Sequence, residues 1–332
     1  MFNKDFLTLQ NLTASVNKTP FLETTLSRFF QVGRIATTTA MVERGASGLQ
    51  LIDPSPRYQP APDATDAGLA RTQYTISSVK LGRTVTISGE KIQNIRAFGT
   101  EDALETFEGV LNQETGSVRN WIAHTHENLR WGTVKGKQYA ANGTTVLTNF
   151  FTLAGVTEPD EVEIDFVNAS RADLQNAFAD MGDYVRTGLG VNADAAQNVA
   201  YLYGKNAWRK FRNADPVAAL YDRYQDGAVN RAGVGGQRIP FEIFGAVHMP
   251  YFGASIGDDE FRAVPVGVPG LFRTEFTPLD NPETANTLGL PLYASADNAL
   301  LNKGYIVELA SLPIHYVTQP ECLIGGRHVD TP

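Results

Sequence analysis

The sequence predicts an α+β protein with two subdomains, or with one domain and long excursions from it. Its 332 residues exceed the usual size of one compact domain. Hydrophobic residues make up 42% of the chain and charged residues 19%, which is enough apolar material for a large core and too little charge for disorder. β-type segments precede Gly99, a long helical pattern follows it, and strands and shorter helices fill the rest of the chain.

The composition also excludes several classes of protein. The chain has 28 basic and 36 acidic residues, and its net charge of −8 disfavours a specific nucleic-acid-binding surface. The single cysteine, Cys322, excludes an internal disulfide and a cysteine-based zinc site, and we expect a buried, inert thiol. Neither a secretory signal nor a stretch of about 20 apolar residues is found, so we expect a soluble protein made in a cytoplasm.

Residues 35–95 predict a long extended segment. Short β-type runs alternate with turn residues, and the Pro-, Ala-, Asp- and Gly-rich piece at 54–70 cannot form a core. An isolated β-ribbon is only marginally stable in water. We therefore expect this segment to lie on another surface or to stay mobile.

A helix of about 28 residues is predicted over residues 100–129, about 42 Å long at 1.5 Å per residue. Thr100 is a plausible N-cap, and Glu101 and Asp102 suit the N-terminal end of the helix dipole. Gly109 and Gly116 interrupt the helix; they mark either a bend or close packing, and we favour close packing. Its apolar positions are Leu104, Phe107, Val110, Leu111, Val118, Trp121, Ile122 and Leu129.

The next elements are a hairpin, a strand and a helix. Asn142–Gly143 suits a type I′ turn in a hairpin over residues 135–151. Polar and apolar residues alternate over 161–167, which indicates a strand with one wet face. Ser170 then opens a helix over residues 171–187.

Residues 191–303 predict a separate α/β unit. It begins with a strand, continues with a short helix around Trp208 and a helix that starts at Pro216, and ends in several strands over 239–276. The tail from Gly304 adds two strands, YIVELA and PIHYVT. We expect them to return to the first subdomain, because the strand at 161–167 otherwise lacks partners.

One motif resembles a catalytic nucleophile. Residues 253–257 spell G-x-S-x-G around Ser255, but a nucleophile elbow needs a helix directly after it. Acidic residues and a strand-like segment follow instead. We expect a surface turn, and a serine hydrolase using Ser255 is the least favoured alternative.

The histidines form no catalytic group in the sequence. His124 and His126 are two apart on a helix, so they point in different directions and we expect two helix-surface groups. His248, His315 and His328 are scattered, with no nucleophile, acid or cofactor motif beside them. We therefore predict a protein that is not an enzyme, with no catalytic, cofactor-binding or metal-binding residues.

Two further patterns resemble ligand-binding sites, but each has a simpler structural interpretation. Gly233, Gly235 and Gly236 resemble a phosphate loop only loosely, and we expect a flexible loop. The carboxylates of Glu161, Glu163 and Asp165 could hold a divalent ion. Alternating carboxylates on one strand more often form a solvated or partner-facing surface, which is the interpretation we favour.

Four passages carry a resemblance to a known family: RAFGTEDALETFEGVL at 96–111, KGKQYAANGTTVLTNFF at 135–151, PVGVPGLFRTEFTPLDNPETANTLGLPLYA at 265–294 and ELASLPIHYVTQPECLIG at 308–325. They are similar, in this order, to passages of the lambda-type phage major capsid protein family, also called the major capsid protein E family. Members of this family have the Hong Kong 97-type capsid fold.

The resemblance implies names for the predicted parts. These are an N-terminal arm at 1–43, an extended E-loop at 44–92, a peripheral domain at 93–190 with the spine helix at 100–129, an axial domain at 191–303, and return strands of the peripheral domain at 304–332.

The resemblance also implies a function. The chain would be the major head protein of a tailed bacteriophage, assembling in the host cytoplasm into hexamers and pentamers of an icosahedral shell around double-stranded DNA. Expected partners are other copies of the chain, a portal protein, a scaffold protein, a decoration protein as a further candidate, and packaged DNA contacted non-specifically. No cofactor and no membrane are expected. The alternative within this fold is an encapsulin-like nanocompartment shell that loads a cargo protein.

Overall fold

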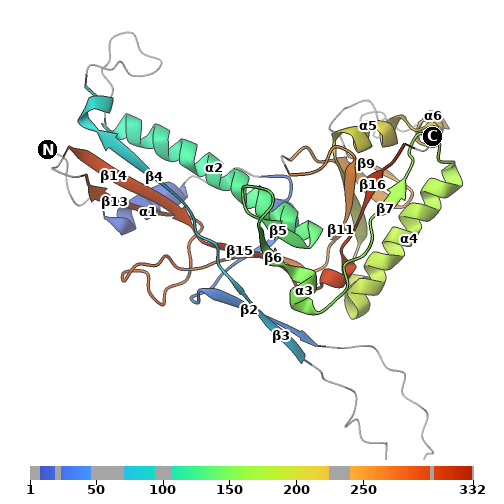
Figure 1. The fold of residues 1–332 in the computed structure, drawn as a ribbon, viewed down its shortest axis with the longest axis horizontal. Coiled ribbons are helices and arrows are strands. Elements are labelled where there is room, and N and C mark those ends of the chain that lie inside the picture. The colour runs from blue at the N-terminus through green and yellow to red at the C-terminus, as the bar shows by residue number, and fades with distance from the viewer. Residues whose placement is uncertain are drawn as a thin grey trace, which may run out of the picture. The chain divides into compact units, whose positions relative to one another are not determined.

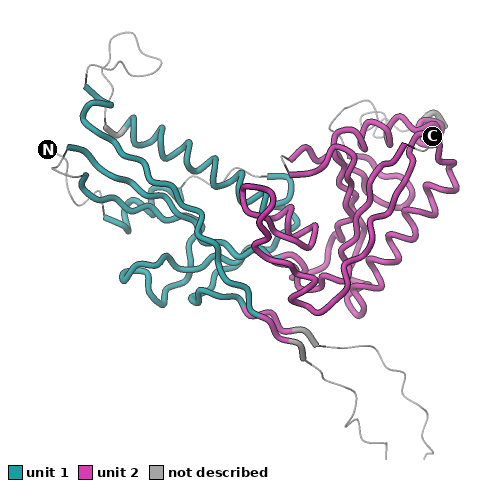
Figure 2. Tube along the Cα trace, viewed as in Figure 1, with its two compact units in different colours: residues 1–40, 75–129, 273–315 teal, residues 41–74, 130–272, 316–332 magenta. Residues whose placement is uncertain are grey.

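The computed structural model describes residues 8–18, 24–45, 71–93, 107–223, 240–253, 255–299 and 303–330 (Figure 1). Contacts divide the chain into two compact units, each built from segments that are far apart in sequence (Figure 2). Unit 1 comprises residues 1–40, 75–129 and 273–315. Unit 2 comprises residues 41–74, 130–272 and 316–332.

The helices are α1 (Leu9–Lys18), α2 (Phe107–Lys135), α3 (Phe150–Ala154), α4 (Arg171–Leu189), α5 (Lys205–Asn213) and α6 (Asp215–Arg223). The first strands are β1 (Gln31–Arg34), β2 (Thr39–Gly45), β3 (Arg71–Ser77), β4 (Leu81–Ser88), β5 (Lys137–Tyr139), β6 (Val146–Asn149), β7 (Val162–Ile164) and β8 (Asn198–Tyr203). The remaining strands are β9 (Phe241–Ile243), β10 (Ala246–Pro250), β11 (Glu260–Val266), β12 (Phe272–Phe276), β13 (Tyr293–Asn298), β14 (Gly304–Ser311), β15 (Pro313–Val317) and β16 (Ile324–His328).

Unit 1 is built on the antiparallel sheet β13-β14-β4. β14 pairs with β4 over eight residues, from Gly304 opposite Ser88 to Ser311 opposite Leu81. Apolar residues of α1 and α2 pack with one face of this sheet, and Thr13 of α1 accepts a hydrogen bond from the Ala294 amide (3.2 Å). The buried members of this core are Leu12, Val85, Ile87, Leu111, Val118, Ile122, Leu292, Ala294, Val307 and Leu309.

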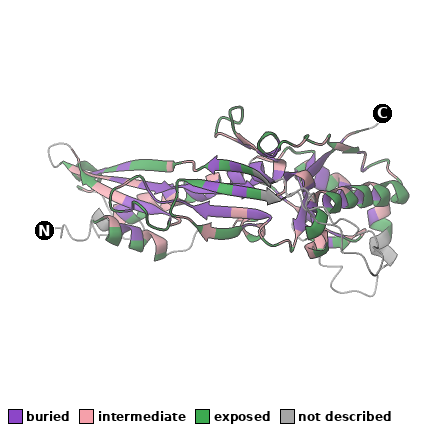
Figure 3. Cartoon of the chain, turned by 90° about the horizontal axis from the view of Figure 1, so that it is seen from below, coloured by how far each residue is buried: buried purple, intermediate pink, exposed green. Residues whose placement is uncertain are grey.

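Unit 2 is built on a mixed sheet with the order β7-β16-β11-β8-β10-β9. β16 runs parallel to β7, β11 runs antiparallel to both β16 and β8, and β10 runs parallel to β8. Buried residues concentrate in the strands, and exposed ones cover the outer faces of the helices (Figure 3). Aromatic rings fill the core: Tyr203 lies 5.0 Å from Phe211 and 5.4 Å from Phe261 between ring centroids.

The long helix ends later than predicted. The first described residue of α2 is Phe107, so the predicted start at residues 100–106, with Thr100, lies outside the described residues. The predicted end at residue 129 is wrong, because Trp131 and Val134 are buried and continue the apolar stripe to Lys135. Gly136 then ends the helix with a φ of 84°, in the left-handed region that favours glycine.

Close packing in α2 occurs at Gly132 and not at the predicted Gly116. A Cβ added to Gly116 would meet nothing within 4 Å, so close packing does not explain this residue. At Gly132 a Cβ would lie 2.8 Å from the Gln138 Cα and 2.8 Å from the Lys137 carbonyl oxygen. The glycine that lets the backbone approach closely is therefore Gly132, where the β5–β6 hairpin folds back on the helix.

The hairpin forms as predicted, but its turn is not type I′. The Ala140 amide donates to the Thr145 carbonyl (2.8 Å), which leaves a four-residue loop. Only Gly143 of the Asn-Gly pair has a positive φ (71°), whereas type I′ requires it at both residues. The Asn142 side chain instead accepts from the Thr144 and Thr145 amides (3.1 and 3.0 Å).

The other predicted elements are largely confirmed. Ser170 opens α4 with a reciprocal capping box to Asp173, and Pro216 lies in the first turn of α6. The tail strands become β14 and β15, but neither pairs with the strand at 161–167. That strand, β7, finds its partner in β16 instead. The five predicted parts, from arm to return strands, stay predictions.

Candidate functional site

Ser255 lies in a turn, as predicted. The strand β10 precedes it, and β11 begins at Glu260, so no helix follows the serine. A nucleophile elbow needs that helix to project its serine from a strained strand-to-helix turn. The geometry therefore gives no support to a hydrolase using Ser255.

His126 is buried, contrary to the prediction, whereas His124 is exposed as predicted. His126 Nδ1 lies 2.9 Å from His315 Nε2, and both residues belong to unit 1. The helical pattern contains the missed signal, because His126 lies four residues after the buried Ile122 and three before the buried Leu129. Trp121, assigned to the inner stripe, is instead 55% exposed.

The hydrogen bonds around these two histidines fix where their protons lie. Ser311 Oγ donates to the Pro291 carbonyl (2.6 Å), so it accepts from His126 Nε2 (3.1 Å). When both rings are neutral, His126 Nδ1 accepts from His315 Nε2, and His315 Nδ1 accepts from Thr274 Oγ1 (2.8 Å). All four ring nitrogens are satisfied with both rings neutral, which is the arrangement of a structural pair.

His248 and His328 are also structural. Burial lowers the pKa of His248 to about 3, although its bond to the Ile243 carbonyl acts in the opposite direction. Tyr203 Oη lies 2.7 Å from His248 Nδ1. His328 stacks on Phe166 at 5.5 Å between ring centroids, and its Nδ1 accepts from the Phe166 amide (3.2 Å).

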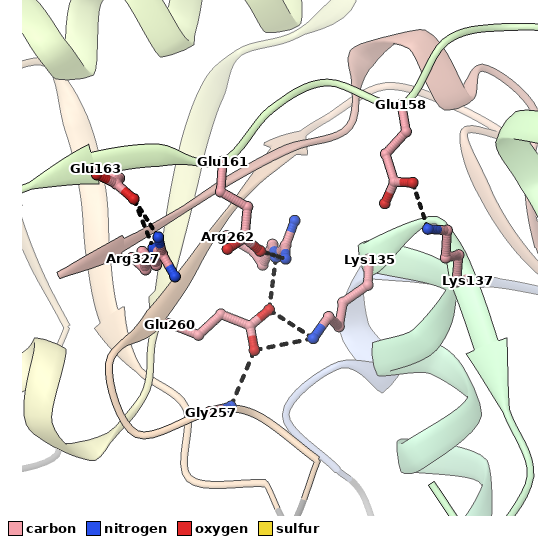
Figure 4. A network of polar contacts seen from close by, with 9 residues as sticks. All are labelled: Lys135, Lys137, Glu158, Glu161, Glu163, Gly257, Glu260, Arg262 and Arg327. Carbon is pink, nitrogen blue, oxygen red and sulfur yellow. Dashed lines mark hydrogen bonds and ion pairs between the residues drawn. The ribbon is translucent and has the colours of Figure 1, made fainter. Parts of the chain in front are cut away.

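The acidic residues of β7 and its flanks bind arginines or backbone amides. Glu161 pairs with Arg262, and Glu163 accepts from Arg327 Nε at 3.0 Å (Figure 4). Asp165 accepts from the amides of Val167 (2.9 Å) and Asn168 (3.2 Å). In the part of the chain that the structure describes, no group of three or more candidate ligands is placed to hold a metal ion. Glu161 and Glu163 are 42% and 52% exposed, which agrees with the solvated surface that we favoured, and both pair with arginines of the same unit.

The carboxylate of Glu260, on β11, is the centre of the polar network in Figure 4. Its side chain is only 10% exposed and accepts from Lys135 Nζ (3.0 Å), Arg262 Nε (2.8 Å) and the Gly257 amide (3.0 Å). Burial alone would raise the pKa of Glu260, but the charges of Arg262 and Lys135 outweigh it and the pKa is lowered. The network joins the end of α2 to β11 within unit 2.

Of the two remaining sequence candidates, the structure describes Cys322. Cys322 is fully buried, and burial raises the pKa of its thiol to about 12, which agrees with the inert thiol that was predicted. The glycines at 233, 235 and 236 lie outside the described residues.

The buried histidines and carboxylates are used in internal contacts, so exposed surfaces are the remaining candidates for a function. The first is the β2–β3 ribbon. Val42 of β2 and Tyr74 of β3 are buried, and Tyr74 Oη donates to the Val317 carbonyl (3.3 Å). Met41 on the opposite face is 59% exposed. The described base of the ribbon is therefore anchored within the subunit, and the piece at 54–70, which we predicted to form no core, lies outside the described residues.

The second exposed surface belongs to the β13-β14-β4 sheet of unit 1. Along β4, Val85 and Ile87 are buried, whereas the alternating Thr84 and Thr86 are exposed. The exposed face continues onto β14, where Glu308 pairs with Lys80 at 2.7 Å. The β4 part of this face is therefore open and carries hydroxyl groups, which suits contact with another macromolecule.

Comparison with known proteins gives a family match over nearly the whole chain. The family model for phage major capsid protein E matches residues 8–327. A search of curated protein sequences finds no significant match.

Solved structures give the same result for the fold. A proposed prophage capsid protein from E. coli CFT073 is 12% identical with a TM-score of 0.60, and the match covers 97% of this chain and 99% of that one. The mature capsid of bacteriophage PhiM1 gives 10% identity, a TM-score of 0.55 and coverage of 95% and 90%. A Mycobacterium phage Bobi structure gives 9% identity, a TM-score of 0.55 and coverage of 100% and 95%. At these identities the likeness concerns the fold alone, and it confirms the α+β, Hong Kong 97-type prediction.

Proposed function

As a member of the phage major capsid protein E family, this chain is a shell protein of a tailed phage, and we propose that it closes into an icosahedral head around double-stranded DNA. The family match over residues 8–327 is the observation that carries the proposal. Hexamers and pentamers of this chain would form the faces and vertices of the shell.

The described surfaces support assembly. A two-stranded ribbon is marginal by itself in water, and a half-open sheet leaves polar and apolar groups facing solvent. Both become contact area when another subunit covers them. Many modest interfaces per subunit then act together, so a shell is stable although each single contact is weak.

The net charge of −8 suits a wall that encloses DNA without binding it tightly. The mature protein would reside in the virion after assembly in the cytoplasm of a bacterial host. A scaffold protein, a portal protein and a decoration protein are the further partners in this proposal. No cofactor, metal or membrane takes part in it.

We also propose that the chain has no catalytic activity, because its buried histidines and carboxylates are used in internal contacts. The test is esterase activity on generic substrates, measured for the unmutated protein and for Ser255→Ala. The expected result is no activity in either. Activity that Ser255→Ala abolishes would contradict the proposal.

Shell expansion is the conformational step in this proposal, and Gly116 of α2 is a candidate hinge. A Cβ at Gly116 meets nothing within 4 Å, so Gly116→Ala fits the folded subunit and stiffens the helix by about 1 kcal/mol. We expect Gly116→Ala particles to assemble normally and to expand more slowly. Electron microscopy of particle diameter over time measures the expansion. Expansion at an unchanged rate would contradict the hypothesis that Gly116 is a hinge.

Electron microscopy of the purified protein, expressed with and without a scaffold, tests the main proposal. Closed shells of uniform diameter are expected. A protein that stays a single subunit at every concentration would refute it. Phage particles with one portal vertex and a tail would distinguish a phage head from an encapsulin-like compartment, which has neither and carries a cargo protein.

A further inference from the structure

The solvent-facing side of α2 bears an unusual set of residues. Gln113, Ser117, Asn120, Trp121 and His124 lie within an arc of about 100° at 3.6 residues per turn, so they form one stripe over three turns. The stripe contains no carboxylate and no lysine or arginine. Exposed helix faces of soluble proteins usually carry charged residues, so this composition calls for an explanation.

Trp121 is the largest apolar group on this stripe and is 55% exposed. The guanidinium of Arg83, on β4, lies over its ring at 5.2 Å from the centroid. Arg83 is itself exposed, and no described carboxylate is in ion-pair contact with it. The nearby Glu114 is already paired with Lys91 (3.2 Å), so it does not neutralise the guanidinium.

A stacked Arg–Trp pair surrounded by amides has the composition of a protein–protein contact. The centres of such interfaces are enriched in Trp and Arg and depleted in Lys, Glu and Asp. The stacking also holds both side chains in place, so less side-chain freedom is lost when a partner covers them. These features point to a surface that is already organised for binding.

We infer that the Trp121 patch, formed by Arg83, Gln113, Asn120, Trp121 and His124, is covered by an acidic surface of a second copy of this chain. The inference rests on the proposed shell function. Charge complementarity selects the occupant: each copy carries a net charge of −8, whereas the patch offers an unneutralised guanidinium and no carboxylate.

Duplex DNA fits this patch less well than protein does. Phosphate binding relies on several cations, and this patch presents one arginine. The bases of a duplex are already stacked within it, and Arg83 covers one face of the indole. An exposed indole beside a guanidinium therefore favours a protein surface.

Tryptophan fluorescence tests the inference directly. Trp131 and Trp208 are 1% and 2% exposed, so acrylamide quenching in the free subunit reports mainly on Trp121. We expect free subunits to show a quenchable component that Trp121→Phe lacks. Empty shells of the unmutated protein should lose that component and quench like shells of Trp121→Phe.

Assembly measurements give a second readout. Trp121→Ala and Arg83→Ala should raise the protein concentration needed for half-maximal assembly about tenfold, while unfolding midpoints of the free subunit stay unchanged. Leu288→Ala is the matched control, because Leu288 is 62% exposed and also belongs to unit 1. It should assemble like the unmutated protein.

Each outcome decides the inference. Empty shells in which Trp121 stays fully quenchable would overturn it and leave the proposed function intact. Protection that appears only in DNA-filled heads would overturn it in favour of DNA as the occupant. Subunits that never assemble, with Trp121 quenchable throughout, would refute the proposed function and the inference together.

Discussion

Unit 2 and unit 1 bury their sheets in different ways. In unit 2 the central strand β8 is buried at five of its six residues, so both faces of that sheet are covered. In unit 1 buried and exposed residues alternate over Thr84–Ile87 of β4, so one face is covered and the other is open. The rings of unit 2 also contact one another closely, whereas unit 1 leaves Trp121 half in solvent.

This difference indicates that the two units have different roles, with unit 2 stabilising the fold and unit 1 offering surfaces for assembly. Unit 2 meets its own packing requirements, and its buried carboxylate Glu260 is neutralised by Lys135 and Arg262. Unit 1 leaves the hydroxyl groups of β4 and the Trp121 patch without cover from the part of the chain that the structure describes. Surfaces that a subunit leaves open are those that assembly can use, so we expect mutations in unit 2 to change folding and mutations on the open surfaces of unit 1 to change assembly.

The largest effect on stability is expected from Phe261→Ala in unit 2. Phe261 is fully buried, with the rings of Tyr203 at 5.4 Å and Phe166 at 5.5 Å. The cavity left behind should lower the free energy of unfolding by about 4 kcal/mol. Urea unfolding of the free subunit measures this change, with Val167→Ala, at a 54% exposed position, as control. A loss below about 1 kcal/mol would mean that unit 2 is not closely packed.

Glu260→Gln should have the next largest effect. It keeps the shape of the side chain and removes the charge that Lys135 and Arg262 share. We expect a loss of about 2–3 kcal/mol in the free energy of unfolding at pH 7. The carboxylate has a lowered pKa, so the difference between variant and unmutated protein should shrink as the pH falls below 4.5. A difference that does not change with pH would contradict this role for the charge.

Acid should destabilise unit 2 through His248. Its pKa is about 3 in the folded protein and 6.5 in the unfolded chain, so below pH 6.5 the unfolded chain binds the extra proton. The free energy of unfolding should therefore fall by about 1.4 kcal/mol per pH unit from this residue, or about 2 kcal/mol between pH 6.5 and pH 5. His248→Phe should flatten this slope, and an unchanged slope would exclude His248 as its cause.

The smallest effect is expected on the open face of unit 1. Thr84→Ala should change the free energy of unfolding by less than about 0.5 kcal/mol, because Thr84 is exposed on β4. The same variant should alter the assembly threshold if this face is covered in the shell. A larger loss of stability would show that the face is already packed within the subunit.

Local signals in the sequence predicted most elements. Ser170 with Asp173, and the alternation around residues 161–167, each act within a few residues, so they can be read from the chain. The partner of β7 and the pairing of His126 with His315 depend on contacts 164 and 189 positions apart. Trp121 and His126 show the limit most clearly, because hydrophobicity assigned the tryptophan to the core and the histidine to the surface. Hydrogen-bond partners from β14 and β15 made the opposite arrangement stable.

Hydrogen exchange of free subunits and assembled empty shells is the most direct measurement of the contrast between the two units. The account predicts that assembly slows exchange in β4, Leu81–Ser88, while β8, Asn198–Tyr203, exchanges at the same rate in both states. Closed shells in which β4 exchanges as fast as in the free subunit would contradict it.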